Sequence, residues 1–347
     1  MDKIKFFDST LRDGSHSIQH QLTKQNIEDY CKGVNGAGMN AVIVGHGNGL
    51  GASSIQVGLS LLPDNIMLET ARVNLPQTPL GIYMIPGFGT IHDDLIPAIE
   101  QGVDVFTIGC HCTEANTTKQ HIEFLVSQGK ETYGVLMMYH TASTQRILEE
   151  AKKMQEYGAR GVFLMDSAGA STPEMVKRTV STLKSGLDIE IGFHAHNNMG
   201  LAVGNSYTAL TEGATLMDGT LRGFGAGAGN LQIEALIAIL EQSGVNTGVK
   251  LNKLLHVSNE VMNSITGFNV GVGPLSVATG MNGVFSAFTL PILRESREKN
   301  IDPFELIEAV GTKRLVGGQE DIIIEIAENL SRQNEDSVID SQMASLS

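Results

Sequence analysis

Short runs of β-branched or aromatic residues alternate with longer segments of helical periodicity along the first 250 residues of the chain. This alternation is typical of βα units around a parallel sheet. The runs cover residues 4–8, 40–44, 80–85, 103–108, 133–138, 161–165, 188–194 and 215–219. Eight strands with intervening helices in about 250 residues match the size of a TIM barrel, and a doubly wound sheet seldom reaches that strand count in this length. We therefore predict a (β/α)8 barrel.

Two of the intervening helices have clear sequence signals. Residues 144–157 place their apolar side chains on one stripe, and Gly158 follows as a left-handed cap. A second helix is predicted to begin at Thr172-Pro173-Glu174. The Thr172 hydroxyl can cap free amides of the first helical turn. Pro173 has no amide hydrogen, which is tolerated at the first helical position, and the Glu174 carboxylate interacts favourably with the positive end of the helix dipole.

The strand signal stops after Gly248, and the remaining sequence has helical periodicity only. We predict helices at residues 252–265, 283–299, 302–313 and 318–333. The chain is accordingly divided into a catalytic barrel domain over residues 1–250 and an all-helical domain over residues 251–347.

Charge and cysteine content exclude several classes of function. The 24 Lys and Arg against 38 Asp and Glu give a formal net charge of −14, which repels a phosphate backbone or an anionic membrane surface. No apolar run reaches the roughly 18 residues that a membrane span needs. Three cysteines are an odd count that cannot form a disulfide framework. We expect a cytoplasmic protein that binds neither nucleic acid nor membrane.

Polar residues cluster where two of the predicted strands end, which is where the active site of such a barrel lies. Arg12, Asp13 and His16 follow the first run, and His194 and His196 end the seventh. Residues i and i+2 of a strand point to the same side, so the two imidazoles share one face. Alternate strands contribute to a common layer inside the barrel, which allows Asp13 to join them.

Two histidines and one carboxylate leave coordination positions open for substrate oxygens. This donor set suits Mn²⁺ or Mg²⁺, and Zn²⁺ is an alternative. The competing interpretation is a pair of ordinary histidines at a strand end.

The sequence resembles the metal-dependent aldolases and lyases that include 2-isopropylmalate synthase and hydroxymethylglutaryl-CoA lyase, and within them the 4-hydroxy-2-oxovalerate aldolase family. The resemblance is carried by residues 10–14 (TLRDG), 193–202 (FHAHNNMGLA), 223–230 (GFGAGAGN) and 313–321 (KRLVGGQED). His16 favours the aldolases, because the synthases and lyases usually have glutamine at that position.

The resemblance implies cleavage of 4-hydroxy-2-oxovalerate, or a related 4-hydroxy-2-oxo acid, to pyruvate and acetaldehyde or a longer aldehyde. Asp13, His194 and His196 would hold the divalent metal, and Arg12 would stabilise the pyruvate enolate. His16 is the expected base, since the pKa of imidazole lies near working pH. Substrate binding is expected from Arg12, His194 and two further residues, Ser167 and Phe285. No lysine lies near these strand-end clusters, although Lys3 and Lys5 begin the first run.

Three positions depart from the family. Ile43 stands where a glutamate is usual, Asn48 where aspartate is usual, and Phe285 where a tyrosine hydroxyl lies near the substrate's 4-hydroxyl. Loss of that hydroxyl predicts weaker control of C4 stereochemistry unless another group substitutes. The alternatives are an acyl-CoA-using synthase or lyase and a catalytically degenerate scaffold subunit.

The resemblance also implies a protein partner. Family members that act in aromatic hydrocarbon catabolism pass their aldehyde to an acylating acetaldehyde dehydrogenase held against the aldolase. Residues 313–321 match the family and lie outside the predicted barrel. The alternative is that Gly317-Gly318 only terminates one helix and the acidic residues after it begin the next. The sequence leaves the oligomeric state open.

Overall fold

Eight parallel strands close into a barrel in the computed structural model, which describes residues 3–267 and 271–344. Each strand pairs with its neighbours in the sequence, and β1 pairs with β8 to close the ring. The strands are β1 (Lys5–Asp8), β2 (Ala41–Ile43), β3 (Leu80–Met84), β4 (Val105–His111), β5 (Glu131–Met137), β6 (Gly161–Asp166), β7 (Glu190–Ala195) and β8 (Leu216–Gly219). The predicted barrel is confirmed, and each strand overlaps one of the eight predicted runs.

Strand side chains alternate between the barrel interior and the layer under the helices. Phe7 packs inside the barrel, whereas its neighbour Phe6 belongs to the outer core. On β6 the inward-facing Phe163 lies opposite Gly192 of β7. A Cβ on Gly192 would come within 2.6 Å of carbon atoms of the Phe163 ring. The interior is therefore filled by aromatic and long apolar side chains, and the polar residues lie at its rim.

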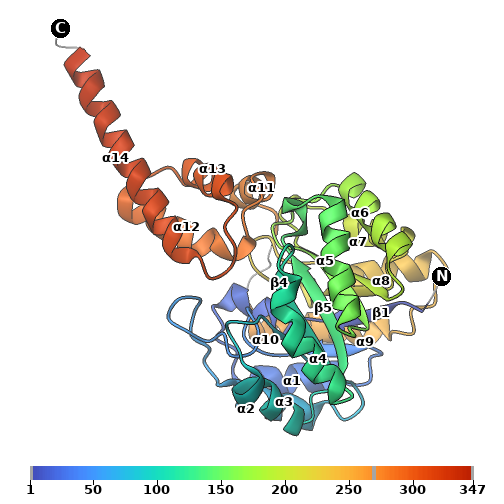
Figure 1. Cartoon of the computed structure of the whole chain (residues 1–347). Coiled ribbons are helices and arrows are strands. Elements are labelled where there is room, and N and C mark those ends of the chain that lie inside the picture. Colours follow the sequence, from blue (N-terminus) through green and yellow to red (C-terminus); the bar gives the residue numbers. More distant parts are fainter. Residues whose placement is uncertain (1–2, 268–270, 345–347) are drawn as a thin grey trace.

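Helices surround the barrel (Figure 1). They are α1 (Lys24–Val34), α2 (Asp64–Asn74), α3 (Ile96–Glu100), α4 (Lys119–Ser127), α5 (Thr144–Glu156), α6 (Pro173–Gly186), α7 (Ala202–Thr211) and α8 (Ile233–Gln242). The predicted helices at 144 and 172 are confirmed as α5 and α6. At the start of α6 the Thr172 hydroxyl accepts a hydrogen bond from the Met175 amide at 3.3 Å, as the sequence signal requires.

The region after the barrel is helical, as predicted. It comprises α9 (Leu251–His256), α10 (Met262–Ile265), α11 (Pro274–Met281), α12 (Thr289–Lys299), α13 (Pro303–Lys313) and α14 (Glu320–Ala344), which extends away from the body of the molecule (Figure 1). The helix predicted from residue 283 begins only at Thr289. Gly283 has a left-handed φ of 64° and Phe285 has a ψ of 127°, so neither residue is helical and an α-helix cannot run through them. The sequence did not predict α11.

Apolar side chains form two separate clusters outside the barrel interior. The larger one includes Leu254, Met262 and Ile265, so α9 and α10 pack with the barrel helices. The second begins at Val284 and joins α12, α13 and α14. Division of the chain after residue 250 stays a prediction, and on this packing we propose a boundary between Ile265 and Val284.

Across residues 3–267 and 271–344, no helix has the length and apolar character needed to cross a membrane.

Candidate active site

The loop after β1 is fixed by a buried carboxylate. Asp8 Oδ1 accepts hydrogen bonds from the Thr10 amide at 3.0 Å and the Thr10 hydroxyl at 2.6 Å. Its Oδ2 accepts a bond from the Tyr30 hydroxyl of α1 at 2.7 Å. The loop then enters a short 3-10 helix at Asp13, and Gly14 allows close contact with Phe224, since a Cβ would lie 2.5 Å from a ring carbon. These contacts hold Arg12 and Asp13 at the carboxyl ends of the strands.

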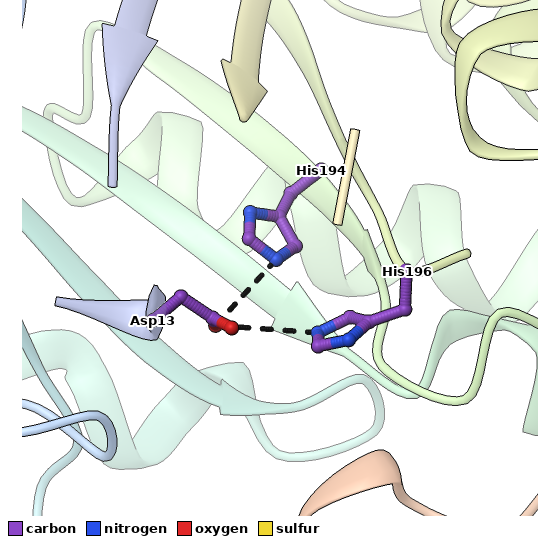
Figure 2. A group of neighbouring side chains, drawn as sticks. All are labelled: Asp13, His194 and His196. Atoms are coloured by element: carbon purple, nitrogen blue, oxygen red, sulfur yellow. Dashed lines mark ion pairs between the residues drawn. The ribbon is translucent and has the colours of Figure 1, made fainter. Parts of the chain in front are cut away.

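Asp13, His194 and His196 meet at one point, as the sequence predicted for a metal centre. Each offers one ligand atom, and these atoms lie within 4.8 Å of one another (Figure 2). Asp13 Oδ2 is 3.7 Å from His194 Nε2 and 4.0 Å from His196 Nε2. All three side chains are buried.

Second polar groups orient two of these side chains. His194 Nδ1 lies 2.8 Å from Asp218 Oδ2, and the other oxygen of Asp218 accepts a bond from the Ser9 hydroxyl at 2.7 Å. A carboxylate partner holds a proton on His194 Nδ1, and in the neutral form of the ring Nε2 then carries a lone pair. Asn230 donates from Nδ2 to Asp13 Oδ1 at 2.8 Å, which leaves Oδ2 toward the imidazoles.

The donor set fits a divalent cation. His194 Nε2 is buried and has no hydrogen-bond partner among the described residues. A lone pair on nitrogen that faces a carboxylate oxygen at 3.7 Å cannot form a hydrogen bond with it, and both groups are ligands of divalent metals. A cation between them would satisfy both.

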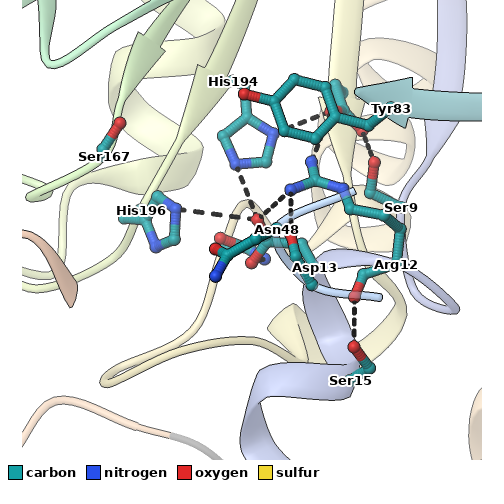
Figure 3. Close-up of polar contacts among 12 residues, drawn as sticks. Ser9, Arg12, Asp13, Ser15, Asn48, Tyr83, Ser167, His194 and His196 are labelled. Atoms are coloured by element: carbon teal, nitrogen blue, oxygen red, sulfur yellow. Dashed lines mark hydrogen bonds and ion pairs between the residues drawn. The ribbon is translucent and has the colours of Figure 1, made fainter. Parts of the chain in front are cut away.

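Arg12 lies directly beside this cluster (Figure 3). Its Nη1 donates to Asp13 Oδ2 at 2.7 Å and to the Gly47 carbonyl at 3.2 Å, and its guanidinium lies 4.7 Å from the centre of the Tyr83 ring. Its Nε is buried, with no partner in the described part of the chain. Arg12 therefore retains a donor for an oxygen atom of a bound ligand.

The protonation states suit a metal site. Burial opposes ionisation of Asp13, but the adjacent Arg12, with smaller contributions from His196 and His194, holds the pKa of Asp13 below its ordinary value. Burial lowers the pKa of His196 to about 3. At neutral pH the site thus offers a carboxylate and a neutral imidazole, the forms that bind metal.

A cavity opens beside the cluster. Its lining includes Arg12, Asp13, His16, Asn48 and Phe285, which come from three loops far apart in the sequence. His16 packs on Gly47 at the edge of this cavity. A Cβ on Gly47 would lie within 2.6 Å of two carbon atoms of the His16 ring. Burial lowers the pKa of His16. A neutral imidazole therefore faces the cavity.

The two other predicted substrate-binding residues occupy different environments. Phe285 lines the cavity and packs edge-on against Phe288 with ring centres 5.3 Å apart. Ser167 is buried on the β6 side of the cluster and is not part of the cavity lining (Figure 3). Its hydroxyl accepts a bond from the Met138 amide at 3.2 Å, and its carbonyl accepts one from the Ser286 amide at 3.1 Å. Ser167 thus joins the barrel to the helical region.

Comparison with known proteins identifies the family. Residues 104–261 match the HMGL-like family, and residues 270–332 match a DmpG-like communication domain. The chain is 46% identical to a 4-hydroxy-2-oxovalerate aldolase of Pectobacterium atrosepticum, over 97% of this chain and 98% of that protein. A 4-hydroxy-2-oxovalerate aldolase of Spirochaeta aurantia is 48% identical over 94% of this chain and 96% of its own length. The chain belongs to the 4-hydroxy-2-oxovalerate aldolase family. It is a carbon–carbon lyase, and membership decides against the acyl-CoA and scaffold alternatives.

Solved structures show the same fold at much lower sequence identity. The carboxyl transferase domain of Rhizobium etli pyruvate carboxylase superimposes with a TM-score of 0.81 at 13% identity. The match covers 96% of this chain and 61% of that one. At this identity the likeness concerns the fold of the aldolase alone.

No lysine is among the described residues that line the cavity of this aldolase. Lys5 is the first residue of β1, and its Nζ lies 2.8 Å from a carboxylate oxygen of Glu190, the first residue of β7. Both residues are at the amino ends of their strands, whereas Asp13 and His194 are at the carboxyl ends. Lys5 is therefore at the opposite end of the barrel from the cavity.

Sequence reasoning missed three residues that contact the side chains of the candidate site. Asp218, which orients His194, was counted only as part of a strand. Asn230, which holds Asp13, appears in the sequence analysis only as the last residue of the 223–230 motif. Tyr83, under the Arg12 guanidinium, belongs to an apolar strand. Only the position of Asp218 near a strand end was a usable signal.

Proposed function

We propose that this aldolase cleaves 4-hydroxy-2-oxovalerate to pyruvate and acetaldehyde, with a divalent ion, Mn²⁺ foremost and Mg²⁺ or another divalent metal as alternatives, held by Asp13, His194 and His196. The observation that carries the proposal is the unpartnered His194 Nε2 directed at a carboxylate that is ionised at neutral pH. Bound there, the ion would act as a Lewis acid on the 2-oxo group.

Arg12 binds and stabilises the oxo-acid end of the substrate in this proposal. Its Nη1 is occupied by Asp13 and Gly47, whereas Nε has no partner among the described residues. Donation from Nε to an oxygen of the substrate places a fixed positive charge where the enolate develops, in a buried site where such charge is most effective. Ser167 retains a hydroxyl proton, because its bond from Met138 uses only a lone pair, but it lies outside the cavity lining, so the substrate carboxylate is assigned to Arg12 alone.

His16 takes the proton of the 4-hydroxyl group. Burial lowers the pKa of this imidazole, so the ring is neutral at working pH and can accept a proton. As the O–H bond breaks, the C4 oxygen becomes the aldehyde carbonyl and the C3–C4 bond breaks. Its electron pair forms the enolate of pyruvate, and delivery of one proton to C3 then gives pyruvate. The proton removed and the proton added balance.

The apolar part of the cavity receives the aldehyde half. Ile85, Phe88, Met137, Met165 and Phe285 line this part. The C5 methyl group of 4-hydroxy-2-oxovalerate, or a longer alkyl chain in its place, is expected to bind there through apolar contact.

A protein partner and a cellular setting belong to the same proposal. Residues 270–332 match a communication domain, which supports contact with an acylating acetaldehyde dehydrogenase. Phe304 is an exposed apolar residue of this region, with 45% of its surface accessible.

We place the reaction in the cytoplasm and in aromatic hydrocarbon catabolism, and the three free thiols agree with a reducing compartment.

The test is the product spectrum of the purified protein. Metal-stripped protein is incubated with 4-hydroxy-2-oxo acids of several chain lengths, with and without Mn²⁺, and pyruvate formation is coupled to lactate dehydrogenase. We expect metal-dependent pyruvate release together with one equivalent of aldehyde. Pyruvate release without aldehyde, or no turnover of any member of the series, would contradict the proposal.

A further inference from the structure

Tyr83 is a buried phenol at the boundary between the charged and the apolar parts of the cavity. Its side chain lies inside the barrel on β3, and only 3% of its surface is accessible. The ring lies over the Arg12 guanidinium on one side (Figure 3). At its other end the hydroxyl donates to Met137 Sδ at 3.0 Å. A thioether is a weak acceptor, so this hydroxyl proton is available to a stronger one.

No other side chain that lines the cavity carries a hydroxyl group. The lining consists of Arg12, Asp13, His16, Gly47, Asn48, Tyr83, Ile85, Phe88, Met137, Met165, His196, Ala226, Phe285, Ala287 and Gly317. Within this set the aldehyde side is otherwise apolar. Among the residues that line this cavity, Tyr83 is therefore the one hydroxyl donor for the middle of a bound substrate.

Space for the phenol is built into the neighbouring strand. Gly109 of β4 faces the end of the Tyr83 ring, and a Cβ on Gly109 would lie 2.7 Å from both Cε2 and Cζ. Any larger residue at position 109 would push the ring away from this position. The barrel thus fixes both the ring and the direction of its O–H group.

We propose that Tyr83 donates a hydrogen bond to the C4 oxygen of the substrate and thereby selects one configuration at C4. This inference rests on the proposed function. Arg12, on one side of Tyr83, binds the oxo-acid end, and Met137, on the other, contacts the alkyl end. The C4 oxygen of a 4-hydroxy-2-oxo acid lies between those two ends. Burial also raises the pKa of Tyr83, which keeps the phenol protonated as a donor.

The geometry predicts stereoselectivity despite Phe285. A donor fixed at one point in the cavity can reach the C4 oxygen of only one enantiomer while the oxo-acid end stays on Arg12 and the alkyl group stays in the apolar part. The other enantiomer must leave the donor unpaired or move its alkyl group. We expect the wild type to favour one enantiomer by about 10-fold in kcat/KM, a ratio that one hydrogen bond can supply.

The test compares Tyr83→Phe with Tyr133→Phe on both enantiomers of 4-hydroxy-2-oxovalerate. Tyr133 is a matched control, since its hydroxyl is also inside the barrel but contacts Lys5 and Glu131 at the far end. We expect Tyr83→Phe to lower kcat/KM for the favoured enantiomer about 10-fold and to reduce the ratio between enantiomers to nearly one. Tyr133→Phe should retain the wild-type ratio.

Exchange of the C3 protons of pyruvate with deuterium from the solvent provides a separate readout. This partial reaction has no C4 oxygen, so Tyr83→Phe should slow the exchange much less than it slows cleavage of the favoured enantiomer. Gly109→Ala displaces the phenol without removing it and should also lose selectivity. Equal kcat/KM for both enantiomers in the wild type, or an unchanged ratio in Tyr83→Phe, would overturn the role of Tyr83. Absence of cleavage by the wild type with metal would instead overturn the proposed function, and this inference with it.

Discussion

Two of the three candidate metal-binding side chains have a polar neighbour that determines which atom faces the ion. Asp218 accepts from His194 Nδ1, and Asn230 donates to Asp13 Oδ1. Each contact occupies one atom of the ligand and leaves the other directed at a common point. Such neighbours raise metal affinity because they fix the tautomer and the orientation of the ligand before the metal binds.

Removal of the Asp218 carboxylate should therefore weaken metal binding without removing a ligand. We expect Asp218→Ala to lower Mn²⁺ affinity about 10–100-fold, as is usual for such a neighbour. Titration of metal-stripped protein followed by electron paramagnetic resonance measures this affinity. The exposed Asp188, also close to β7, supplies the control variant Asp188→Ala. Equal affinity in Asp218→Ala and the wild type would show that His194 needs no such orientation.

Replacement of His16 should affect catalysis but not metal binding. We expect His16→Ala to bind Mn²⁺ normally and to lose about 10²–10⁴-fold in kcat, the usual contribution of a positioned base. The exposed His92 provides the control variant His92→Ala. Wild-type turnover in His16→Ala would remove this residue from the mechanism.

The pH dependence of kcat/KM gives an independent check on His16. Burial lowers its pKa below the ordinary imidazole value of 6.5, so the neutral, active form persists to lower pH than in a solvent-exposed histidine. With saturating Mn²⁺, kcat/KM should fall with an acid limb whose midpoint lies below pH 6.5. His16→Ala should lack that limb. A midpoint above 6.5 would indicate a different base.

Residue types and their spacing were enough to predict part of the site. The His-x-His spacing and the strand-end position indicated that His194 and His196 share one face, and the structure places Asp13 beside them. Tyr83 could not be recognised in this way, because a tyrosine in an apolar strand is indistinguishable from barrel packing. Its position depends on contacts with Arg12 and Met137, which are distant in the sequence.

At the level of the elements, strand register explains why these partners meet. β7 pairs with β8 so that His194 lies opposite Asp218, and the loop after β2 brings Gly47 against His16. The strands were predictable from local patterns. The register was not, because it depends on closure of the whole barrel.

Gly47 should be essential for the placement of His16. A methyl group on Gly47 would lie within 2.6 Å of His16 Cδ2 and Cε1, so the ring must move. We expect Gly47→Ala to lower kcat by at least about 10-fold with little change in Mn²⁺ affinity, since no metal ligand contacts that position. Gly204→Ala is the control, because a Cβ on Gly204, within α7, meets no atom within 4 Å. A normal kcat in Gly47→Ala would contradict this account of the loop.

Helix boundaries in the C-terminal region show the limits of periodicity. α13 was predicted closely because Asp302 caps it, with Oδ1 accepting from the Phe304 amide at 2.8 Å. The predicted start at residue 283 was wrong, because Gly283 and Phe285 adopt turn conformations that join the helices to the barrel. A hydrophobic pattern continues through such a turn, although the helix does not.

On the scale of the whole molecule, the helical region forms part of the cavity. Phe285 and Gly317 line it, and the Ser286 hydroxyl donates to the Ser167 carbonyl at 3.0 Å. The side chain of Gln56, in the loop after β2, also donates to the Gly318 carbonyl. A protein bound to the helical region beside Phe285 or Gly317 would therefore lie close to the cavity from which aldehyde is released.

We expect the full chain to associate with an acylating acetaldehyde dehydrogenase. Sedimentation of the mixture should show a species larger than either protein alone. Phe304→Asp, on the exposed surface of α13, should weaken the complex, whereas Val126→Asp, on the exposed surface of α4, should not. Independent sedimentation of the two wild-type proteins would leave residues 313–321 as a helix boundary only.

The most direct test of the metal-dependent mechanism is a Mn²⁺ titration of metal-stripped protein in which bound metal and the initial rate of 4-hydroxy-2-oxovalerate cleavage are measured on the same samples. The geometry predicts one bound ion per chain, a cleavage rate that rises in proportion to site occupancy, and loss of both in Asp13→Ala and His194→Ala. Cleavage at the full rate in metal-stripped protein, or tight Mn²⁺ binding retained by either variant, would contradict it.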